Sequence, residues 1–327
     1  MCAATWAAAQ VPRVGEVELY GFRKVKEETA RRALNVKAGD ALPPSKGDLE
    51  ERLELIPGVV QARIEAVCCE NGNAVLFAGV EERGASHFAF RSAPTGIMVL
   101  PGAVAEHYAG LLASLEAAAR RGSTAEDLTR GHALMADSAT RKLQEQLVPL
   151  ASEHLAAIRA VLRDAADPAA RAAAAAVIGY TPDKKAVLDD LQYALQDPDA
   201  SVRAAALRSL TAIAVLAARE PSLGIRIPFT WFVEMLNSLV LSDRTRAAAA
   251  LVNLTEGDAA SALAQIRERA LDSVVEMARW KTLRYALPAF ILAGRMAGMG
   301  QKEIEAAWTA GDRDSVLQRL RPAKRGD

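Results

Sequence analysis

The feature that most constrains the fold of this 327-residue chain is the stretch from Asp197 to Leu216. Proline lacks a backbone N–H and forces the preceding residue out of the αR region, so Asp197 and Pro198 separate two helices. The second helix is expected to begin near Ala200. Its apolar stripe consists of Val202, Ala206, Leu210 and Ile213. The residues that fall away from this stripe are Arg203, Arg208 and Thr211. A helix with such a stripe needs a partner surface.

Two weaker copies of this pattern occur elsewhere in the chain. One begins at Asp167 and stops at Gly179, a residue suited to the left-handed position beyond a helix end. The other begins at Asp243 and has no proline. Measured between Asp167 and Asp197, the first two copies are 30 residues apart. Self-similarity at such a period predicts a solenoid of helix pairs, whose units bury their apolar faces by stacking.

Asp197, Val202 and Arg203 match the opening of the second helix in one kind of repeat, in which Asp-Pro and a short spacer precede Val-Arg. The pattern resembles the HEAT repeat family, in its short bacterial form. The resemblance implies an all-α superhelical solenoid. It also implies that Asp197 and Arg203 bond across the turn and to adjacent repeats, forming a structural ladder.

The composition favours helices and leaves the chain without a net charge. Half of the residues (51%) are apolar, mostly alanine and leucine, and only 5% are aromatic, which suits close-packed helices better than sandwiches. Forty basic and forty acidic side chains cancel. No global field attracts a polyanion, so we expect a protein or peptide partner and no nucleic acid. Nucleic-acid binding is the alternative if a basic stripe lies on one face of the neutral chain.

Residues 11–84 carry the pattern of a small α/β unit. The predicted elements are strands at 14–19, 60–68 and 74–82 and helices at 26–34 and 46–55. The turn Asn71-Gly72-Asn73 joins the last two strands into a hairpin. The predicted order is therefore β-α-α-β-β.

Short characteristic segments mark the ends of these predicted elements. They are Gly21, Gly39-Asp40, Ile56-Pro57-Gly58-Val59 and Glu81-Glu82-Arg83. Together these features resemble a POTRA domain. The resemblance implies a place on the non-cytoplasmic side of a bacterial membrane and binding of polypeptides, in some cases by strand addition. The alternative is a small α/β module packed on the solenoid.

Candidate partner-binding residues lie in both parts of the chain. The POTRA resemblance implies that 60–68 is an exposed sheet edge, where a peptide would meet Gln61, Arg63 and Glu65. Charged side chains also block unwanted edge pairing, so the opposite interpretation stays open. On the solenoid, the candidates are Arg208 and Thr211.

The rest of the chain is predicted to be helical after a linker at 85–98, which includes a short strand at 87–90. The helices expected over 99–327 lie at 104–121, 123–131, 138–163, 230–241, 246–254, 259–279, 282–297 and 302–320, besides those of the repeats. This is roughly five helix pairs. The two most apolar segments, 229–241 and 285–299, are shorter than about 20 residues and contain charges, so no integral membrane segment is predicted.

The sequence predicts no catalytic, cofactor-binding or metal-ligating residues, and so no cofactor. The four histidines lack the i, i+4 spacing of a metal site, and no nucleotide or hydrolase motif occurs. Glu126, Asp127 and His132 would surround a cation on one short helix, but capping explains the two carboxylates better. A bridge between Cys68 and Cys69 is not expected, because neighbouring side chains on a strand point to opposite faces.

Residues 1–10 are similar to the end of a secretory signal, with Ala7-Ala8-Ala9 as a cleavage site. Export to the periplasm follows from this interpretation. A frayed alanine-rich terminus is the alternative, and the protein is expected to be cytoplasmic if Met1 is the true start.

These observations predict an α+β protein, in which a POTRA-like unit precedes a HEAT-like solenoid. The predicted function is that of a non-catalytic scaffold or adaptor for protein–protein interaction in the bacterial cell envelope. The alternative is a lyase-like or glycosylase-like enzyme with its site on the inner surface of the solenoid. A pocket that joins His107, His132 and several carboxylates would favour the enzyme, whereas a bare open groove would favour the scaffold.

Overall fold

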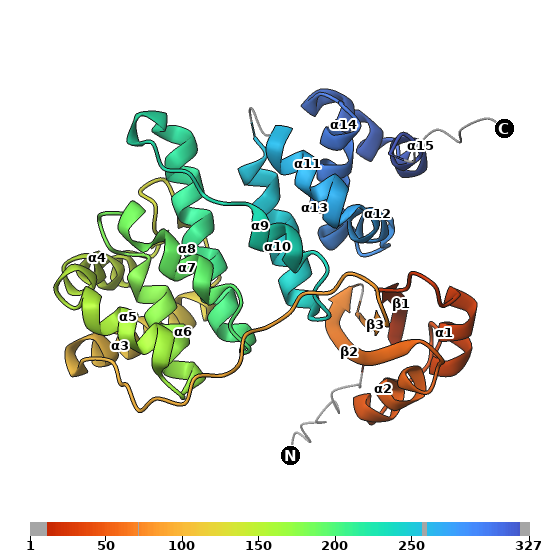
Figure 1. Cartoon of the computed structure of the whole chain (residues 1–327), viewed down its shortest axis with the longest axis horizontal. Coiled ribbons are helices and arrows are strands. Elements are labelled where there is room, and N and C mark those ends of the chain that lie inside the picture. Colours follow the sequence, from red (N-terminus) through yellow and green to blue (C-terminus); the bar gives the residue numbers. More distant parts are fainter. Residues whose placement is uncertain (1–11, 71, 257–259, 321–327) are drawn as a thin grey trace, which may run out of the picture. The chain divides into compact units, whose positions relative to one another are not determined.

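The computed structural model describes residues 12–70, 72–256 and 260–320 (Figure 1). The predicted signal remnant at 1–10 lies outside these residues. The chain divides into two compact units, which we call unit 1 and unit 2. Unit 1 comprises the described residues of 1–87, 237–244 and 269–327, and unit 2 those of 88–236 and 245–268.

Unit 1 contains the predicted small sheet. Its first elements are β1 (Val14–Tyr20), α1 (Glu27–Leu34), α2 (Lys46–Glu54), β2 (Val59–Glu70) and β3 (Asn73–Glu82). The strand order is β1-β3-β2, with β1 parallel and β2 antiparallel to β3. The β-α-α-β-β order agrees with the one predicted from hydrophobic alternation.

One face of this sheet packs against α1 and α2. The shared core includes Val17, Leu34, Leu53, Ile64 and Leu76. These residues come from alternate positions of the strands and from one side of each helix. The apolar residues spaced by two in the strands and by three to four in the helices therefore form one core. Their burial is the main stabilising contribution to this layer.

The second face of the sheet is covered by helices from the C-terminal part of the chain. Tyr20 and Phe77 are fully buried, and their rings lie edge-on to Trp280 with centroid distances of 6.0 and 5.2 Å. Trp280 follows the first of the helices α12 (Leu271–Arg279), α13 (Leu283–Met296), α14 (Gln301–Thr309) and α15 (Arg313–Gln318). Unit 1 therefore differs from the predicted division into 11–84 and 99–327, because β3 is apolar on both faces and recruits these helices.

Unit 2 is helical. Its helices are α3 (Gly102–Arg120), α4 (Ser138–Glu153), α5 (Leu155–Asp164), α6 (Pro168–Ile178), α7 (Leu188–Ala194), α8 (Ala200–Arg219), α9 (Thr230–Met235), α10 (Leu241–Leu254, whose first turn belongs to unit 1) and α11 (Ala260–Arg269). Two 3₁₀ turns occur at Lys185–Val187 and Pro221–Leu223. The pairs α5–α6 and α7–α8 are stacked so that α6 packs directly on α8. A solenoid-like arrangement of helix pairs is thus present.

The α8 helix agrees with the pattern from which it was predicted. It begins at Ala200, and Asp199 accepts a hydrogen bond from the N–H of Ser201 as its N-cap. All four residues of the predicted stripe have no exposed surface. Arg203, which was expected to fall away from the stripe, is also buried, because its guanidinium bonds to main-chain carbonyls.

The repeat length is 32 residues rather than 30. Asp167 caps α6 as Asp199 caps α8, and an arginine follows each cap after four residues. Asp167 is thus equivalent to Asp199 and not to Asp197. The two Asp-Pro pairs are not equivalent in the repeat. The proline of α6 lies inside the helix, whereas Pro198 precedes the N-cap of α8, so a period measured between these pairs is too short.

Several local predictions were wrong. The helix expected at 123–131 is replaced by a two-stranded ribbon of β4 (Glu126–Asp127) and β5 (Leu134–Met135), since so short a helix is marginal and β5 is buried by tertiary packing. The helix expected at 138–163 breaks at His154, and the one expected at 259–279 breaks at Ala270. No strand forms at the described residues 87–90. Cys68 and Cys69 are joined by a disulfide, contrary to the prediction.

One described helix, α8, is long and apolar enough to cross a membrane by length and composition. Half of its most apolar window (50%) is buried within the protein. The two segments judged most apolar from the sequence correspond to the shorter helices α9 and α13.

Candidate functional site

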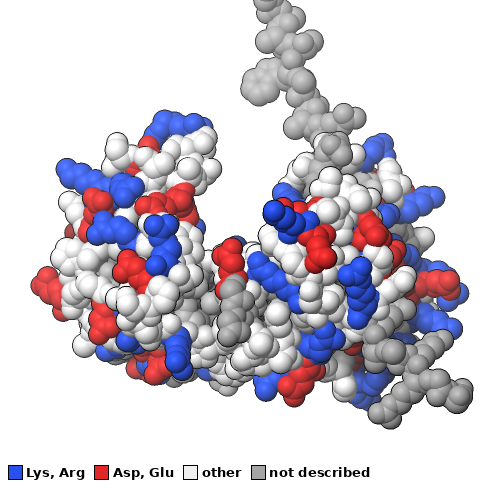
Figure 2. Space-filling view, turned by 90° about the horizontal axis from the view of Figure 1, so that it is seen from above, with Lys and Arg blue, Asp and Glu red and all other residues white. Residues whose placement is uncertain are grey.

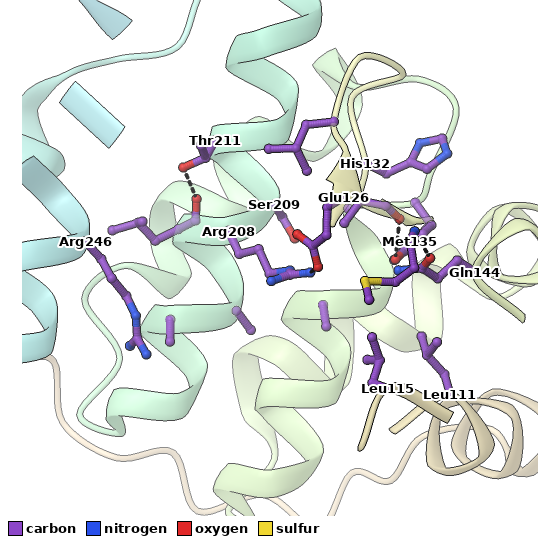
Figure 3. A pocket seen from close by; sticks show the side chains of 18 of the residues that line it. Leu111, Leu115, Glu126, His132, Met135, Gln144, Arg208, Ser209, Thr211 and Arg246 are labelled. Carbon is purple, nitrogen blue, oxygen red and sulfur yellow. Dashed lines mark hydrogen bonds and ion pairs between the residues drawn. The ribbon is translucent and has the colours of Figure 1, made fainter. Parts of the chain in front are cut away.

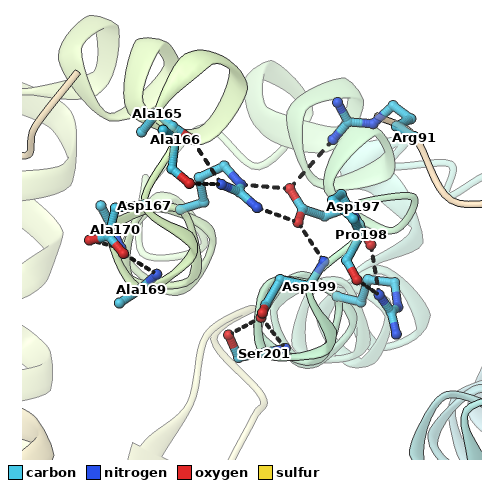
Figure 4. Close-up of polar contacts among 12 residues, drawn as sticks. Arg91, Ala165, Ala166, Asp167, Ala169, Ala170, Asp197, Pro198, Asp199 and Ser201 are labelled. Atoms are coloured by element: carbon cyan, nitrogen blue, oxygen red, sulfur yellow. Dashed lines mark hydrogen bonds and ion pairs between the residues drawn. The ribbon is translucent and has the colours of Figure 1, made fainter. Parts of the chain in front are cut away.

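A buried ion pair joins the two copies of the repeat (Figure 4). The guanidinium of Arg171 in α6 donates two parallel hydrogen bonds of 2.8 Å to the carboxylate of Asp197, which precedes α8. The two side chains are 2% and 0% exposed, so water does not screen the pair. Because hydrogen bonding to Asp197 favours the charged form, the pKa of Arg171 is raised further above its usual value. This bidentate pair fixes the position of α8 relative to α6.

The predicted ladder residues, Asp197 and Arg203, bond to each other across the turn through a main-chain carbonyl. Nη1 of Arg203 donates to the main-chain carbonyls of Asp197 and Pro198, at 2.7 and 2.9 Å. Arg171 makes the same two bonds one repeat earlier, to residues six and five positions before it. Arg244 in the third copy also donates to the carbonyl six positions before it, that of Ser238. The arginine of each copy therefore ties down the loop that leads into its own helix.

An open cavity of about 720 Å³ lies in unit 2, where α6, α8 and α10 present their inner faces. Small side chains form much of its floor: Ala176, Gly179, Ala204, Ala205, Ala249 and Ala250. The β4–β5 ribbon and α3 form another wall, with Leu111, Leu115, Leu128 and Met135. The cavity is therefore apolar over most of its lining, and it is of the size at which proteins bind ligands or partner side chains.

Charged side chains also line the cavity (Figure 3). Arg208 of α8, half-exposed, pairs with Glu126 of β4 across the cavity. Arg246 of α10 also lines the cavity and has no ion-pair partner among the described residues. Thr211 donates a hydrogen bond to the carbonyl of Leu207 within its own helix. Both solenoid residues predicted from the sequence, Arg208 and Thr211, thus line one cavity.

Two buried basic side chains, those of Lys184 and His132, lie next to each other. Nζ of Lys184 donates to the carbonyl of Gly179 at 2.7 Å and lies 3.2 Å from Nδ1 of His132. Burial, together with Lys184 and Arg130, lowers the pKa of His132 to about 4. Burial, with Arg130, lowers the pKa of Lys184 to about 8. At neutral pH the imidazole is therefore uncharged, and its Nε2 has no hydrogen-bond partner among the described atoms.

The histidine and carboxylate constellation proposed for an enzyme is only partly brought together. His132 and Glu126 both line the cavity, but His107 does not, since its Nε2 is bonded to the carbonyl of Leu143 at 2.8 Å. Asp127 caps its own turn by accepting from the N–H of Thr129. No group of three or more His, Cys, Asp or Glu side chains suited to a metal ion occurs within the described residues.

The candidate residues on the sheet lie on β2, which is an edge strand as predicted. Gln61 and Arg63 are exposed, and Arg63 pairs with Glu65 at 3.0 Å. Glu65 also accepts a hydrogen bond from the N–H of Leu241, within unit 1. The outward N–H groups of this edge belong to Ala62 and Ile64, and the carboxylates of α2 already occupy them.

Sequence reasoning missed most of the cavity. The walls come from the β4–β5 ribbon and from α3, whose positions no periodicity encodes. Arg246 was placed on a helix but not on the inner face. A signal for the close approach of α6 and α8 was present in Gly179, where an added Cβ would lie 2.5 Å from Oγ of Ser209.

Comparison with known families supports the repeat. The HEAT repeats family matches residues 155–221, which span α5 to α8. This part of the chain is therefore similar to HEAT repeats, and the helical region that contains it is solenoid-like. No curated protein sequence matches the chain.

Proposed function

We propose that this chain is a non-catalytic scaffold that binds a protein partner on the inner face of its helical unit. The observation that carries the proposal is the open cavity of about 720 Å³, whose small-residue floor lies under Arg208 and Arg246. HEAT repeats commonly mediate protein–protein interactions, which supports the same role for α5 to α8. An open apolar surface needs a partner that covers it.

The lining indicates the chemistry of that partner. Two arginines and one carboxylate, Glu126, leave a positive balance over an apolar floor. A partner segment with a carboxylate beside apolar side chains would compete with Glu126 for Arg208 and would pair with Arg246. On the face shown in Figure 2, basic and acidic side chains of the described residues are interspersed, so a local arrangement and not a general field selects this partner.

The experiment is affinity capture from the native cell envelope, followed by mass spectrometry. The test variant is Arg208→Glu with Arg246→Glu. The control is Lys142→Glu with Lys185→Glu, which makes the same change in charge at exposed lysines outside the cavity. We expect partners that bind the parent and the control to be lost, at least about tenfold, from the test variant. Equal recovery with all three proteins would rule out the inner face.

The enzyme alternative rests on one observation, the buried Lys184 with its lowered pKa beside His132. Such an amine is a nucleophile only if it reaches a substrate. Lys184 is 5% exposed and is held by the carbonyl of Gly179. Labelling with trinitrobenzenesulfonate at about pH 8 separates the two functions: modification of Lys184 as fast as that of exposed Lys142 would favour the enzyme, and protection of Lys184 favours the scaffold.

We also propose that the first part of unit 1 is a POTRA-like domain and that the scaffold acts in the bacterial cell envelope, in the periplasm. The strand order β1-β3-β2 and the two helices on one face support this assignment. Fractionation of cells that express the complete reading frame tests the location. A processed periplasmic product is expected, and an unprocessed cytosolic product would overturn the location without affecting the proposed binding surface.

A further inference from the structure

The two edges of the small sheet differ in their backbone hydrogen bonding. Along β2, the N–H of Ala62 donates to Oε1 of Glu54 at 2.9 Å, and the N–H of Ile64 donates to Oε1 of Glu50 at 2.7 Å. Both carboxylates come from α2, one turn apart. They fill the places that the backbone of an added strand would take, so the β2 edge is blocked by the chain itself.

The edge formed by β1 is closed at Val14, whose N–H and C=O bond to Asp40 and Gly39, but it is open at Val17 and Leu19. Consecutive residues of a strand turn their backbone groups to opposite sides, and the carbonyl of Val17 accepts a bond from Nη1 of Arg31 at 3.3 Å on the side away from β3. Val17 and, by alternation, Leu19 therefore direct their N–H groups outward. Among the described residues, no group outside the sheet bonds to either N–H. These donors are available to an incoming backbone.

A cleft of about 670 Å³ follows this open edge. Glu16, Glu18 and Leu19 line it from β1, and side chains of α1 and α12 also line it. The α12 side offers Leu271 and Val275. The cleft therefore combines a free strand edge with apolar side chains beside it, as a site for an added strand requires.

The charges of the cleft favour a basic partner. Of its acidic side chains, Glu16, Glu27 and Glu276 are paired with Lys281, Arg31 and Arg23. The remaining basic side chain of the lining, Arg279, pairs with Asp314 outside the cleft at 3.7 Å. Asp272 in the first turn of α12 is exposed and has no ion-pair partner among the described residues. Glu18 is buried and accepts two backbone N–H groups. A lysine or arginine on the partner would find an unpaired carboxylate at Asp272.

We propose that the cleft binds an extended segment of a partner polypeptide, which adds as a fourth strand to β1 and alternates apolar with basic side chains. Backbone donors at Val17 and Leu19 require a backbone acceptor, which neither a lipid nor a nucleic acid presents in this spacing. The side chain of Arg31 turns away from Val17 when the strand enters, since its other bonds, to Glu27, lie outside the edge. This site belongs to unit 1 and is independent of the inner face of the solenoid.

The first test uses amide hydrogen exchange of the whole chain, observed by NMR. The probe is a capped peptide of about nine residues that alternates valine and lysine, at up to about 1 mM. Exchange of the Val17 and Leu19 amides is expected to slow at least about tenfold, while that of Ala62 and Ile64 stays unchanged. Protection of Ala62 and Ile64 instead, or no binding at this concentration, overturns the proposal.

Variants provide the second test. Leu19→Pro removes one outward donor and leaves the bonds to β3, as proline does on an edge strand, and should weaken peptide binding at least about tenfold. Ala62→Pro is the matched control on the blocked edge and should bind as the parent does. If circular dichroism shows that Leu19→Pro is unfolded, Asp272→Lys decides, because it leaves the sheet intact and should reverse the preference from a valine–lysine to a valine–glutamate peptide.

A third probe isolates the backbone contribution. The same peptide with N-methyl groups on alternate residues keeps its side chains but cannot donate along one edge. Weaker binding by about tenfold or more is expected. If the methylated peptide binds the parent as tightly as the unmodified one, binding does not proceed by strand addition and the proposal fails.

Discussion

At the scale of single residues, arginine occupies buried positions in which an apolar side chain is more common. Arg171 and Arg203 are among the largest fully buried side chains of the described chain, yet each sits at the start of a helix in an alanine-rich repeat. Alanine lets the helices approach closely but offers no directional contact. The arginines supply that direction, because a planar guanidinium bonds to a carboxylate and to two carbonyls at once.

Replacement of Arg171 by methionine should therefore destabilise unit 2 by about 3 kcal/mol, since it removes the bidentate partner of the buried Asp197 carboxylate and leaves Arg91, at 3.7 Å, as a weaker ion-pair partner. Urea denaturation at neutral pH measures the change. Arg120→Met is the control, because Arg120 and Glu116 form an exposed pair on α3 and the loss should stay below about 0.5 kcal/mol. A loss below about 1 kcal/mol for Arg171→Met would contradict the role given to this pair.

His132 gives a pH dependence of known sign. Its pKa is about 4 in the folded protein and near 6.5 when unfolded, so the unfolded state binds more protons between these values and stability falls as the pH falls through them. The full effect is about 3 kcal/mol, reached near pH 4. Lys184 and Arg130 lower the pKa of His132 in the same direction as burial, whereas Asp127 acts in the opposite direction and is the smallest of these effects.

The measurement is the free energy of unfolding at several pH values from about 7 to about 4. His132→Leu should remove this part of the slope, whereas His87→Gln, at an exposed position, should leave it unchanged. Carboxylates with lowered pKa values, such as Asp137 at about 2, titrate below this window. An equal slope in the parent and in His132→Leu would show that the imidazole is not buried as described.

At the scale of elements, the spacing of apolar residues was enough to predict a helix or strand wherever its apolar stripe packs against a single neighbouring surface. The α8 helix, its cap and its buried residues follow from sequence spacing, as do β1, α1 and α2. The β4–β5 ribbon could not be predicted, because tertiary contacts such as the bond from the N–H of Met135 to Gln144 decide it. The β4–β5 ribbon forms one wall of the cavity. Of the lining residues, only Arg208 and Thr211 on α8 were therefore predicted from the sequence as partner-binding candidates.

Leu210→Ala tests the stacking of α8 on its neighbours. Leu210 is fully buried, and its truncation should cost about 2–5 kcal/mol, as expected for a large-to-small change in a core. Leu112→Ala on α3 is the control, since Leu112 is 49% exposed and its loss should cost well under 1 kcal/mol. Equal midpoints of urea denaturation for the two variants would show that the stripe of α8 does not form the core.

At the scale of the whole molecule, unit 1 is built from segments that lie far apart in the sequence. A strand that is apolar on both faces needs cover on both faces, and β3 is buried along Val75, Leu76, Phe77 and Ala78. This unbroken apolar run was a signal that the small sheet is not an independent module with one solvated face. The covering helices come from beyond residue 269, which no local pattern specifies.

Phe77→Ala tests whether the sheet and the C-terminal helices are one cooperative unit. Phe77 contacts Trp280 and Tyr285, with ring centroids 5.2 and 5.7 Å away, and its truncation should cost about 3–5 kcal/mol. Amide exchange should then accelerate together in β1 to β3, α12 and α13, because elements that share a core open together. Ile158→Ala, in the core of α5, should accelerate exchange in α5 to α8 and leave the sheet protected. If Phe77→Ala accelerates exchange only between residues 12 and 84, the sheet is a separate domain and the C-terminal helices belong with the solenoid.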